Sequence, residues 1–161
     1  MFAVIAKKIP AIDKAPKLFA KGWSLWPPFL AAGIKIKRIS ADFREIDVCM
    51  RLSLKNTNYV GTHFGGSLYA MTDPFYMIML IKNLGREYIV WDKAAEINFK
   101  KPGRGTVHAE FRLSQDEIDS IKNKVEADEK KRTLWVKEVL VKDESGEVVT
   151  IVNKTIYVRK K

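Results

Sequence analysis

One apolar stretch constrains the fold of this chain more than any other feature of its sequence. The 18 residues Phe64–Ile81 are mostly apolar, two glycines and a serine stand near their start, and Gly85 follows shortly after their end. This punctuation predicts a helix with a glycine near its C-terminal cap. A helix that is apolar on nearly every face is either deeply buried or crosses a membrane.

The surroundings of this stretch favour burial over a membrane span. Asp73 and Pro74 stand at its middle, glycines stand at its start, and its length is borderline for crossing a bilayer. Alternating strand patterns lie on both sides, as in a sheet of a water-soluble domain. We therefore expect a buried helix and no stable membrane insertion.

Strand patterns account for most of the remaining chain. Before the helix, apolar residues alternate with polar ones from Ile46 to Leu54. After it come four runs rich in β-branched or aromatic residues: Tyr88–Phe99, Gly105–Leu113, Thr133–Val141 and Val148–Val158. Ser114 and Glu117 have the spacing of a capping box, which predicts a short surface helix, and residues 143–146 have the composition of a hairpin turn.

These elements predict an α+β domain in which a curved antiparallel β-sheet wraps around one long central helix. Such a helix needs cover on the side that the sheet leaves open, so we expect an oligomer, either a homodimer or a homotetramer. Pro27 and Pro28 forbid a continuing helix before the first strand pattern. We divide the chain into an N-terminal arm, residues 1–28, and the domain proper, residues 29–161.

The composition limits the cellular compartments and the binding partners that we expect. Cys49 is the only cysteine, and no Cys/His cluster is present, so we expect a reducing, cytoplasmic setting, no metal site and no cofactor. The N-terminal apolar run is too short for a secretory signal. The net charge is +10, but the lysines are scattered and no nucleic-acid-binding motif is recognisable, so we expect no nucleic-acid partner.

The start of the predicted helix carries the chemistry. Gly65 and Gly66 would leave backbone N–H groups free at the helix start, where they could stabilise the oxygen of a thioester carbonyl under attack. Asp73 follows seven residues after Gly66, and a carboxylate in such apolar surroundings is costly unless it has a function or a partner. The alternative is that Asp73 only caps the backbone that Pro74 leaves without a donor.

This region resembles the hotdog-fold thioesterase superfamily. The run from Asn58 through Gly61, Thr62, Gly65 and Gly66 to Asp73 is similar to the phenylacetate-pathway type, and Phe99–Gly105 is similar to a strand-end segment of the superfamily. The whole span Trp23–Arg159 resembles an uncharacterised thioesterase-like subfamily.

The resemblance implies hydrolysis of an acyl thioester, with acyl-CoA as the expected substrate class. Asp73 would be the general base or nucleophile, the N–H groups of Gly65 and Gly66 the oxyanion donors, and Asn58 a group that orients water or substrate. Phe64 stands where the phenylacetate type commonly has histidine, and His63 stands one residue earlier, so His63 is a displaced candidate.

Substrate-binding candidates fall into two groups. Lys100, Lys101 and Arg104 flank a proline-glycine turn, where they either protect a sheet edge or bind the phosphates of coenzyme A. Apolar side chains could line an acyl channel, and Thr72 is a further candidate whose hydroxyl could instead bond to its own backbone. The apolar candidates are Met71, Phe75 and Trp91.

Two other functions stay open on the sequence. A hotdog module could bind acyl-CoA or lipid without catalysis, which the displaced histidine favours. A 3-hydroxyacyl-thioester dehydratase would need a histidine and an acid acting together, for which His63 and Asp73 are available.

Overall fold

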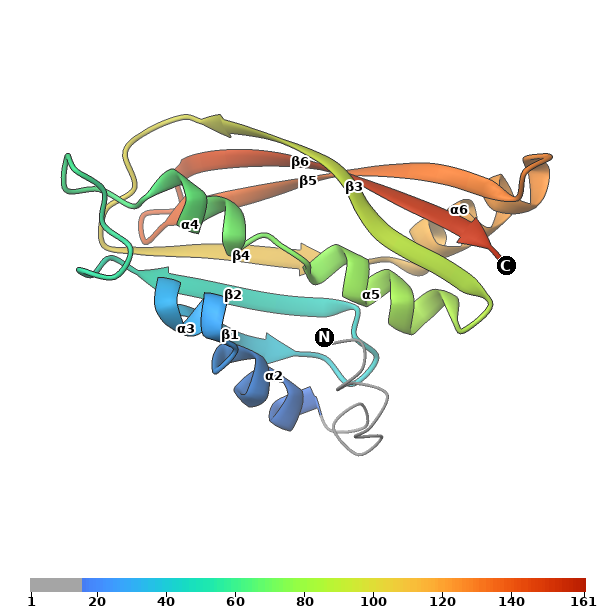
Figure 1. Cartoon of the computed structure of the whole chain (residues 1–161), viewed down its shortest axis with the longest axis horizontal. Helices are drawn as coiled ribbons and strands as arrows, with labels where there is room; N and C mark the ends of the chain where they lie inside the picture. Colours follow the sequence, from blue (N-terminus) through green and yellow to red (C-terminus); the bar gives the residue numbers. More distant parts are fainter. Residues whose placement is uncertain (1–15) are drawn as a thin grey trace.

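The computed structural model describes residues 16–161, and the expectations for the first fifteen residues lie outside that range. One curved sheet of six antiparallel strands dominates the fold, in the order β1-β2-β4-β5-β6-β3 (Figure 1). The strands are β1 (Ile34–Ile39), β2 (Glu45–Arg51), β3 (Tyr88–Phe99), β4 (Thr106–Arg112), β5 (Arg132–Asp143) and β6 (Val148–Lys160). The predicted α+β class and the five predicted strands are confirmed.

Strand β1 was not predicted, and its irregular register explains why. The buried residues of β1 are Ile34, Ile36 and Ile39, so the alternation breaks in its second half. The pairing with β2 shifts at this point, between Ile36 and Arg38. An irregularity of this kind removes the period of two on which strand prediction rests.

The apolar stretch forms two helices, so the expectation of one long central helix is corrected. Helix α4 (Gly65–Ala70) and helix α5 (Phe75–Leu84) follow one another along one face of the sheet (Figure 1). Proline has no N–H to donate and its ring clashes with the preceding helical turn, so Pro74 ends the first helix and the second begins after it. As a result Asp73 lies at the junction between the helices.

The core lies between these helices and the inner face of the sheet. Met71 and Met79 are fully buried, and the rings of Phe75 and Phe111 pack with their centroids 4.9 Å apart. Inward residues of β4 and β6 alternate with outward polar ones, as in Val107, Ala109 and Phe111. The sheet therefore has one apolar face that the helices cover.

Two short helices precede the first strand. Helix α2 (Pro16–Ser24) and helix α3 (Pro27–Ala32) lie beside β1 (Figure 1). Phe19 of α2 belongs to the same core, with its ring centroid 5.3 Å from that of Phe43. Pro27 and Pro28 start α3, a position where proline is tolerated because the first N–H groups of a helix need no helical acceptor. The boundary of an arm at residue 28 stays a prediction.

The remaining local predictions are confirmed. Helix α6 (Gln115–Ala127) begins with a capping box, in which Ser114 Oγ accepts from the N–H of Glu117 at 3.1 Å and the Glu117 carboxylate accepts from the N–H of Ser114 at 3.0 Å. Gly146 has a φ of +86° in the turn between β5 and β6. Across residues 16–161, no helix is long and apolar enough to span a bilayer.

Candidate functional site

The loop before α4 is held in shape by Asn58. The side-chain amide of Asn58 donates to Thr62 Oγ1 at 2.9 Å, and its Oδ1 accepts from the N–H groups of Val60 at 3.1 Å and Thr62 at 3.0 Å. Gly61 adopts a φ of +77°, which favours glycine, and closes the same turn. The hydrogen bonds of Asn58 therefore fix the path by which the chain enters α4.

His63 is buried inside this loop, with 3% of its surface exposed. Its Nε2 lies 3.2 Å from the carbonyl oxygen of Gly105, and its backbone N–H donates to Gly103 at 3.0 Å. Burial lowers the pKa of His63, although the hydrogen bond to Gly105 opposes this, so the ring is neutral at pH 7. Within the described chain, neither a hydrogen bond nor an ion pair joins His63 to Asp73.

The predicted glycine turn is tightly packed against two aromatic rings. A Cβ on Gly65 would lie 2.8 Å from the ring of Phe99, and one on Gly66 would lie 2.4 Å from the ring of Phe64. Phe64 is also the N-cap residue of α4 and provides no side-chain cap. Since the first N–H groups of a helix have no acceptor within the helix, those of Gly65 and Gly66 need a partner outside α4.

A cavity of about 460 Å³ opens beside this turn. It brings together five of the residues that the sequence singled out, and Phe99 adds an apolar wall. These five are Asn58, His63, Gly65, Lys100 and Lys101. Asp73 does not line the cavity, because it lies at the opposite end of α4 from Gly65.

The cations at the rim of the cavity differ in their partners. Lys101 forms ion pairs with Asp143, at 2.5 Å, and with Glu147, both at the β5–β6 hairpin. These hydrogen bonds raise the pKa of Lys101. Lys101 is therefore held by the protein itself, and Lys100 and Arg104 are the exposed cations of the turn.

A cluster of charges that the sequence analysis missed surrounds Asp73. Lys154 of β6 donates from Nζ to Asp73 Oδ1 at 2.8 Å and lies 3.1 Å from Asp92 Oδ1 of β3. The Lys154 side chain is 1% exposed, whereas that of Asp73 is 41% exposed. The ring of Tyr69 in α4 covers the same ammonium, with its centroid 5.2 Å from Nζ. We call these four residues the Lys154 cluster.

A bulge in β3 directs Asp92 into this cluster. The register with β6 shifts between Asp92 and Ala94, with Asp92 opposite Ile156 and Ala95 opposite Lys154. The extra residue turns the strand locally, as bulges beside functional sites often do. Asp92 and Lys154 thereby become diagonal neighbours on the inner face of the sheet.

Burial and charge perturb the titration of the cluster. Burial raises the pKa of Asp92 to about 6, Lys154 opposes the rise, and the neighbouring carboxyl of Asp73 adds to it. Burial would lower the pKa of Lys154, but the hydrogen bond and charge of Asp73, together with Asp92, raise it instead. The ammonium of Lys154 is therefore charged over the whole physiological range.

A simple signal in the sequence could have found this lysine. Lys154 stands in phase with Val152, Ile156 and Val158, the inward positions of β6. A lysine among apolar residues on the buried face of a sheet needs an acidic side chain nearby, because an unpaired buried charge is costly.

The other predicted substrate-binding residues lie elsewhere. Met71 and Phe75 are buried in the core, and Thr72 Oγ1 donates to the carbonyl of Tyr69 at 2.8 Å. Trp91 is 46% exposed and stacks on Tyr157 with ring centroids 4.4 Å apart. In the described part of the chain, none of these four residues lines the cavity beside Gly65.

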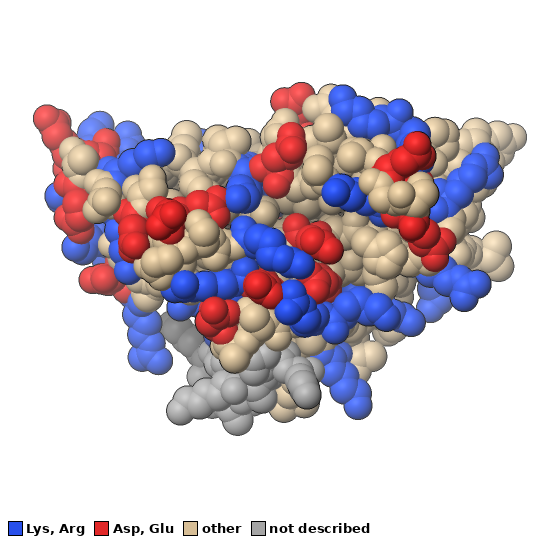
Figure 2. Space-filling view, turned by 180° about the vertical axis from the view of Figure 1, so that it is seen from behind, with Lys and Arg blue, Asp and Glu red and all other residues tan. Residues whose placement is uncertain are grey.

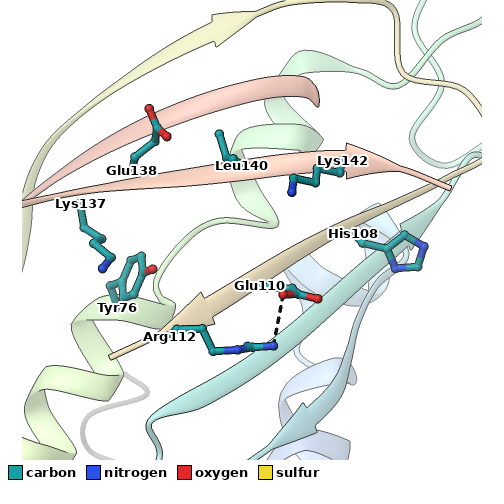
Figure 3. A pocket seen from close by; sticks show the side chains of 8 residues that line it. All are labelled: Tyr76, His108, Glu110, Arg112, Lys137, Glu138, Leu140 and Lys142. Atoms are coloured by element: carbon teal, nitrogen blue, oxygen red, sulfur yellow. Dashed lines mark ion pairs between the residues drawn. The ribbon is translucent and has the colours of Figure 1, made fainter. Parts of the chain in front are cut away.

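A second cavity, of about 340 Å³, opens between β4 and β5 (Figure 3). Its prominent cations are already paired: Arg112 with Asp47 and Glu110, and Lys137 with Glu117. Burial raises the pKa of Tyr76, which also lines it, to about 12. We therefore base the candidate site on the glycine turn and the Lys154 cluster.

On the face seen from behind, the charges do not form a single basic stripe (Figure 2). Figure 2 shows acidic and basic side chains interspersed over the face seen from behind. Among residues 16–161, no group of three His, Cys, Asp or Glu side chains is placed to hold a metal ion.

The family of this chain is shown by its sequence, and solved structures show its fold. The fold is a curved antiparallel sheet around a central helical segment that starts at a glycine turn. The chain belongs to the family described as domain of unknown function DUF4442, whose model matches residues 16–158. No protein of curated function matches the sequence.

Solved structures share this fold. A protein of unknown function from Pseudomonas aeruginosa, described as a probable thioesterase, has a TM-score of 0.77 at 18% identity, and the match covers 90% of this chain and 95% of that one. A thioesterase from Haemophilus influenzae has a TM-score of 0.65 at 14% identity, with 91% of each chain covered. A mutant thioesterase from Pseudomonas aeruginosa has a TM-score of 0.65 at 13% identity, with 89% of this chain and 93% of that one covered.

Proposed function

We propose that this protein hydrolyses acyl thioesters, with acyl-CoA as the substrate class and Asp73 as the general base. The observation that carries the proposal is the anchoring of Asp73: its carboxylate is 41% exposed, yet buried Lys154 holds one of its oxygens at 2.8 Å. A carboxylate that is oriented and still reachable from solvent can take a proton from an attacking water.

The backbone N–H groups of Gly65 and Gly66 are the proposed oxyanion donors. The cavity beside Gly65 offers a place for the thioester. In the reaction, water oxygen attacks the carbonyl carbon while Asp73 takes one of its protons. The carbon–sulfur bond then breaks, and the thiolate gains a proton to give a carboxylic acid and a free thiol.

We propose that two copies of the chain complete each site. Strand β3 is an edge of the sheet, and Lys93 to Glu96 at its middle are all exposed. If β3 pairs antiparallel with itself about this middle, its Phe99 end meets the Asp92 end of the second copy. The Gly65 cavity, which Phe99 walls, would then lie beside Asp73 of the partner subunit.

The rim of the cavity suits the coenzyme A portion of the substrate. Lys100 and Arg104 are exposed cations beside the proline-glycine turn, and such groups bind phosphate well. Lys101, with its two acidic partners, would keep the turn in place.

The experiment that tests this function is the release of free thiol from short, medium, long and aromatic acyl-CoAs. We expect turnover by the parent and a loss of at least about a hundredfold in kcat/KM for Asp73→Asn, the size typical of a lost general base. Asp119→Asn is the matched control, because Asp119 is an exposed carboxylate on α6 whose contact is with Gln115.

Each contrary outcome has a definite meaning. Saturable binding of acyl-CoA without release of thiol from any of them would favour a non-catalytic binding module. Turnover that Asp73→Asn leaves intact would remove Asp73 from the mechanism. A dehydratase is disfavoured, because Nε2 of the buried His63 lies 3.2 Å from the carbonyl oxygen of Gly105.

A further inference from the structure

The Lys154 cluster holds one ammonium between two carboxylates. Lys154 lies 2.8 Å from Asp73 and 3.1 Å from Asp92, and its side chain is 1% exposed. One positive charge cannot fully compensate two negative charges in a poorly hydrated place. The cluster therefore has a reason to take up one proton, on one of its two carboxyl groups.

The two carboxyl groups differ in their access to water. The Asp73 side chain is 41% exposed, whereas that of Asp92 is 20% exposed and faces the inner side of the sheet. The less hydrated acid ionises less readily, so a proton that the cluster takes up below about pH 6 resides on Asp92. Both carboxyl groups contact the same ammonium, at 2.8 Å and 3.1 Å, so they lie close enough to share this proton.

We propose that Asp92 is the proton-sharing partner of Asp73, and that Lys154 is the positioning residue that holds the two carboxyl groups together. This proposal rests on the proposed hydrolysis and deepens it. When Asp73 takes a proton from the attacking water, the proton passes on to Asp92, whose carboxyl group contacts the same ammonium, and it later returns through Asp73 to the departing thiolate. No oxidant, metal or further reactant enters the balance.

The neighbouring elements contribute few other charges to the cluster. Tyr69 of α4 covers the ammonium with its ring, and Lys137 of β5 stands opposite Lys154 in the strand register. Lys137 is paired with Glu117 of α6, which directs its charge away from the two aspartates. The titration of Asp92 is therefore governed by burial, by Asp73 and by Lys154.

The protonation state of Asp92 also predicts the pH below which general-base catalysis by Asp73 is lost. Below the pKa of Asp92 its carboxyl group is already protonated. Asp92 then cannot accept the proton that Asp73 takes from the attacking water. Burial, with the neighbouring Asp73, raises the pKa of Asp92 to about 6, so we expect the acidic limb of activity near this pH.

A carbon-13 NMR titration of the aspartate carboxyl groups tests the proposal without any substrate. We expect the Asp92 signal, assigned by its loss in Asp92→Asn, to titrate with a midpoint near pH 6. In Asp73→Asn the midpoint should fall by about 1 pH unit or more, because the like charge is gone. A midpoint at the ordinary value of an aspartate, or one that Asp73→Asn does not move, would overturn the proposal.

The pH dependence of kcat/KM is the second test. Asp92→Asn should move the acidic limb to lower pH and Lys154→Met should move it to higher pH, while Lys142→Met on the outer face should leave it in place. A merely structural role for Lys154 would lower activity equally at every pH. If Lys154→Met does not fold, the double variant Lys154→Met/Asp92→Asn, which removes one charge of each sign, replaces it: a limb at the parent's pH then contradicts the proposal.

The two proposals fail in different ways. If the parent releases no thiol from any acyl-CoA, the proposed hydrolysis fails, and the NMR titration still decides whether Asp92 and Asp73 share a proton. If the parent hydrolyses acyl-CoA but Asp92 titrates as an ordinary aspartate, hydrolysis stands and the proton-sharing role is wrong.

Discussion

Lys154 Nζ lies 2.8 Å from Asp73 Oδ1, although 81 positions separate the two residues in the chain. This contact joins the junction between two helices to the middle of strand β6. The contact gives the Asp73 carboxylate a fixed orientation and a buried partner.

Removal of the ammonium should destabilise the fold. In Lys154→Met two carboxylates lose their common partner, and breaking a buried pair typically costs about 3–5 kcal/mol. Because Asp73 is partly exposed, we expect a smaller loss, about 2–3 kcal/mol in the free energy of unfolding at pH 7. Urea denaturation followed by circular dichroism measures it, and exposed Lys142→Met should change it by less than about 0.5 kcal/mol. Equal losses in the two variants would show that the ion pair contributes nothing.

Asp92 should make stability fall as the pH rises. Its folded-state pKa is raised to about 6, so the folded protein binds the proton more tightly than the unfolded chain does. This stabilisation is fully present below the ordinary pKa, about 3.9, and is lost as the pH rises through about 6, with an upper limit of about 3 kcal/mol.

The difference between the parent and Asp92→Asn isolates this contribution. Carboxyl groups with lowered pKa values, such as those of Asp47 and Glu117, act in the opposite direction and cancel in the comparison. We expect the free energy of unfolding of the parent to fall relative to that of Asp92→Asn as the pH rises from 4 to 6.5 in denaturation curves. A difference that is constant over this range would contradict the assignment.

Gly65→Ala should destabilise the fold, and the second substitution Phe99→Ala should remove most of this effect. The new Cβ would lie 2.8 Å from the ring of Phe99, and overpacking of this kind costs about 1–3 kcal/mol. Phe99→Ala in the same chain removes the clash, so the double variant should recover most of the loss relative to Phe99→Ala alone. Gly22→Ala in α2, where nothing lies within 4 Å, is the control and should not destabilise. Thermal unfolding of the four proteins completes the cycle.

The exposed edge of β3 should set the oligomeric state. A homodimer formed by self-pairing of β3 brings Ala94 of each copy close to that of the other, so Ala94→Glu places like charges together. We expect the parent to sediment with twice the mass of one chain and Ala94→Glu to sediment as a monomer. Exposed Ala31→Glu on α3 should stay dimeric. A monomeric parent would remove the proposed shared site.

Local features of the sequence predicted much of the fold. Five strands follow from alternation and β-branched residues, the capping box of Ser114 and Glu117 starts α6, and glycine marks the last hairpin. Each of these signals depends on neighbours within a few residues, and such patterns can be read without the fold. Strand β1 was not predicted, because its register shift breaks the alternation of buried and exposed residues.

The prediction of the candidate site was divided in the same way. The glycine turn and Asp73 stand out within one segment of the sequence, and their roles stay predictions, whereas five predicted residues do meet at one cavity. Met71, Phe75 and Trp91 were assigned to an acyl channel on character alone, and they occupy the core and the outer face instead. An apolar residue that lines a channel and one that packs elsewhere in the fold have the same local sequence pattern.

By itself, the sequence determined the strands, the interruption signalled by Asp73 and Pro74, and the glycine turn, since all of these arise from short-range sterics and hydrogen bonding. Only the tertiary structure decided that Lys154 meets both Asp73 and Asp92. That meeting depends on the register of β6 against β3 and on the bulge after Asp92, which are fixed by packing between segments far apart in the chain.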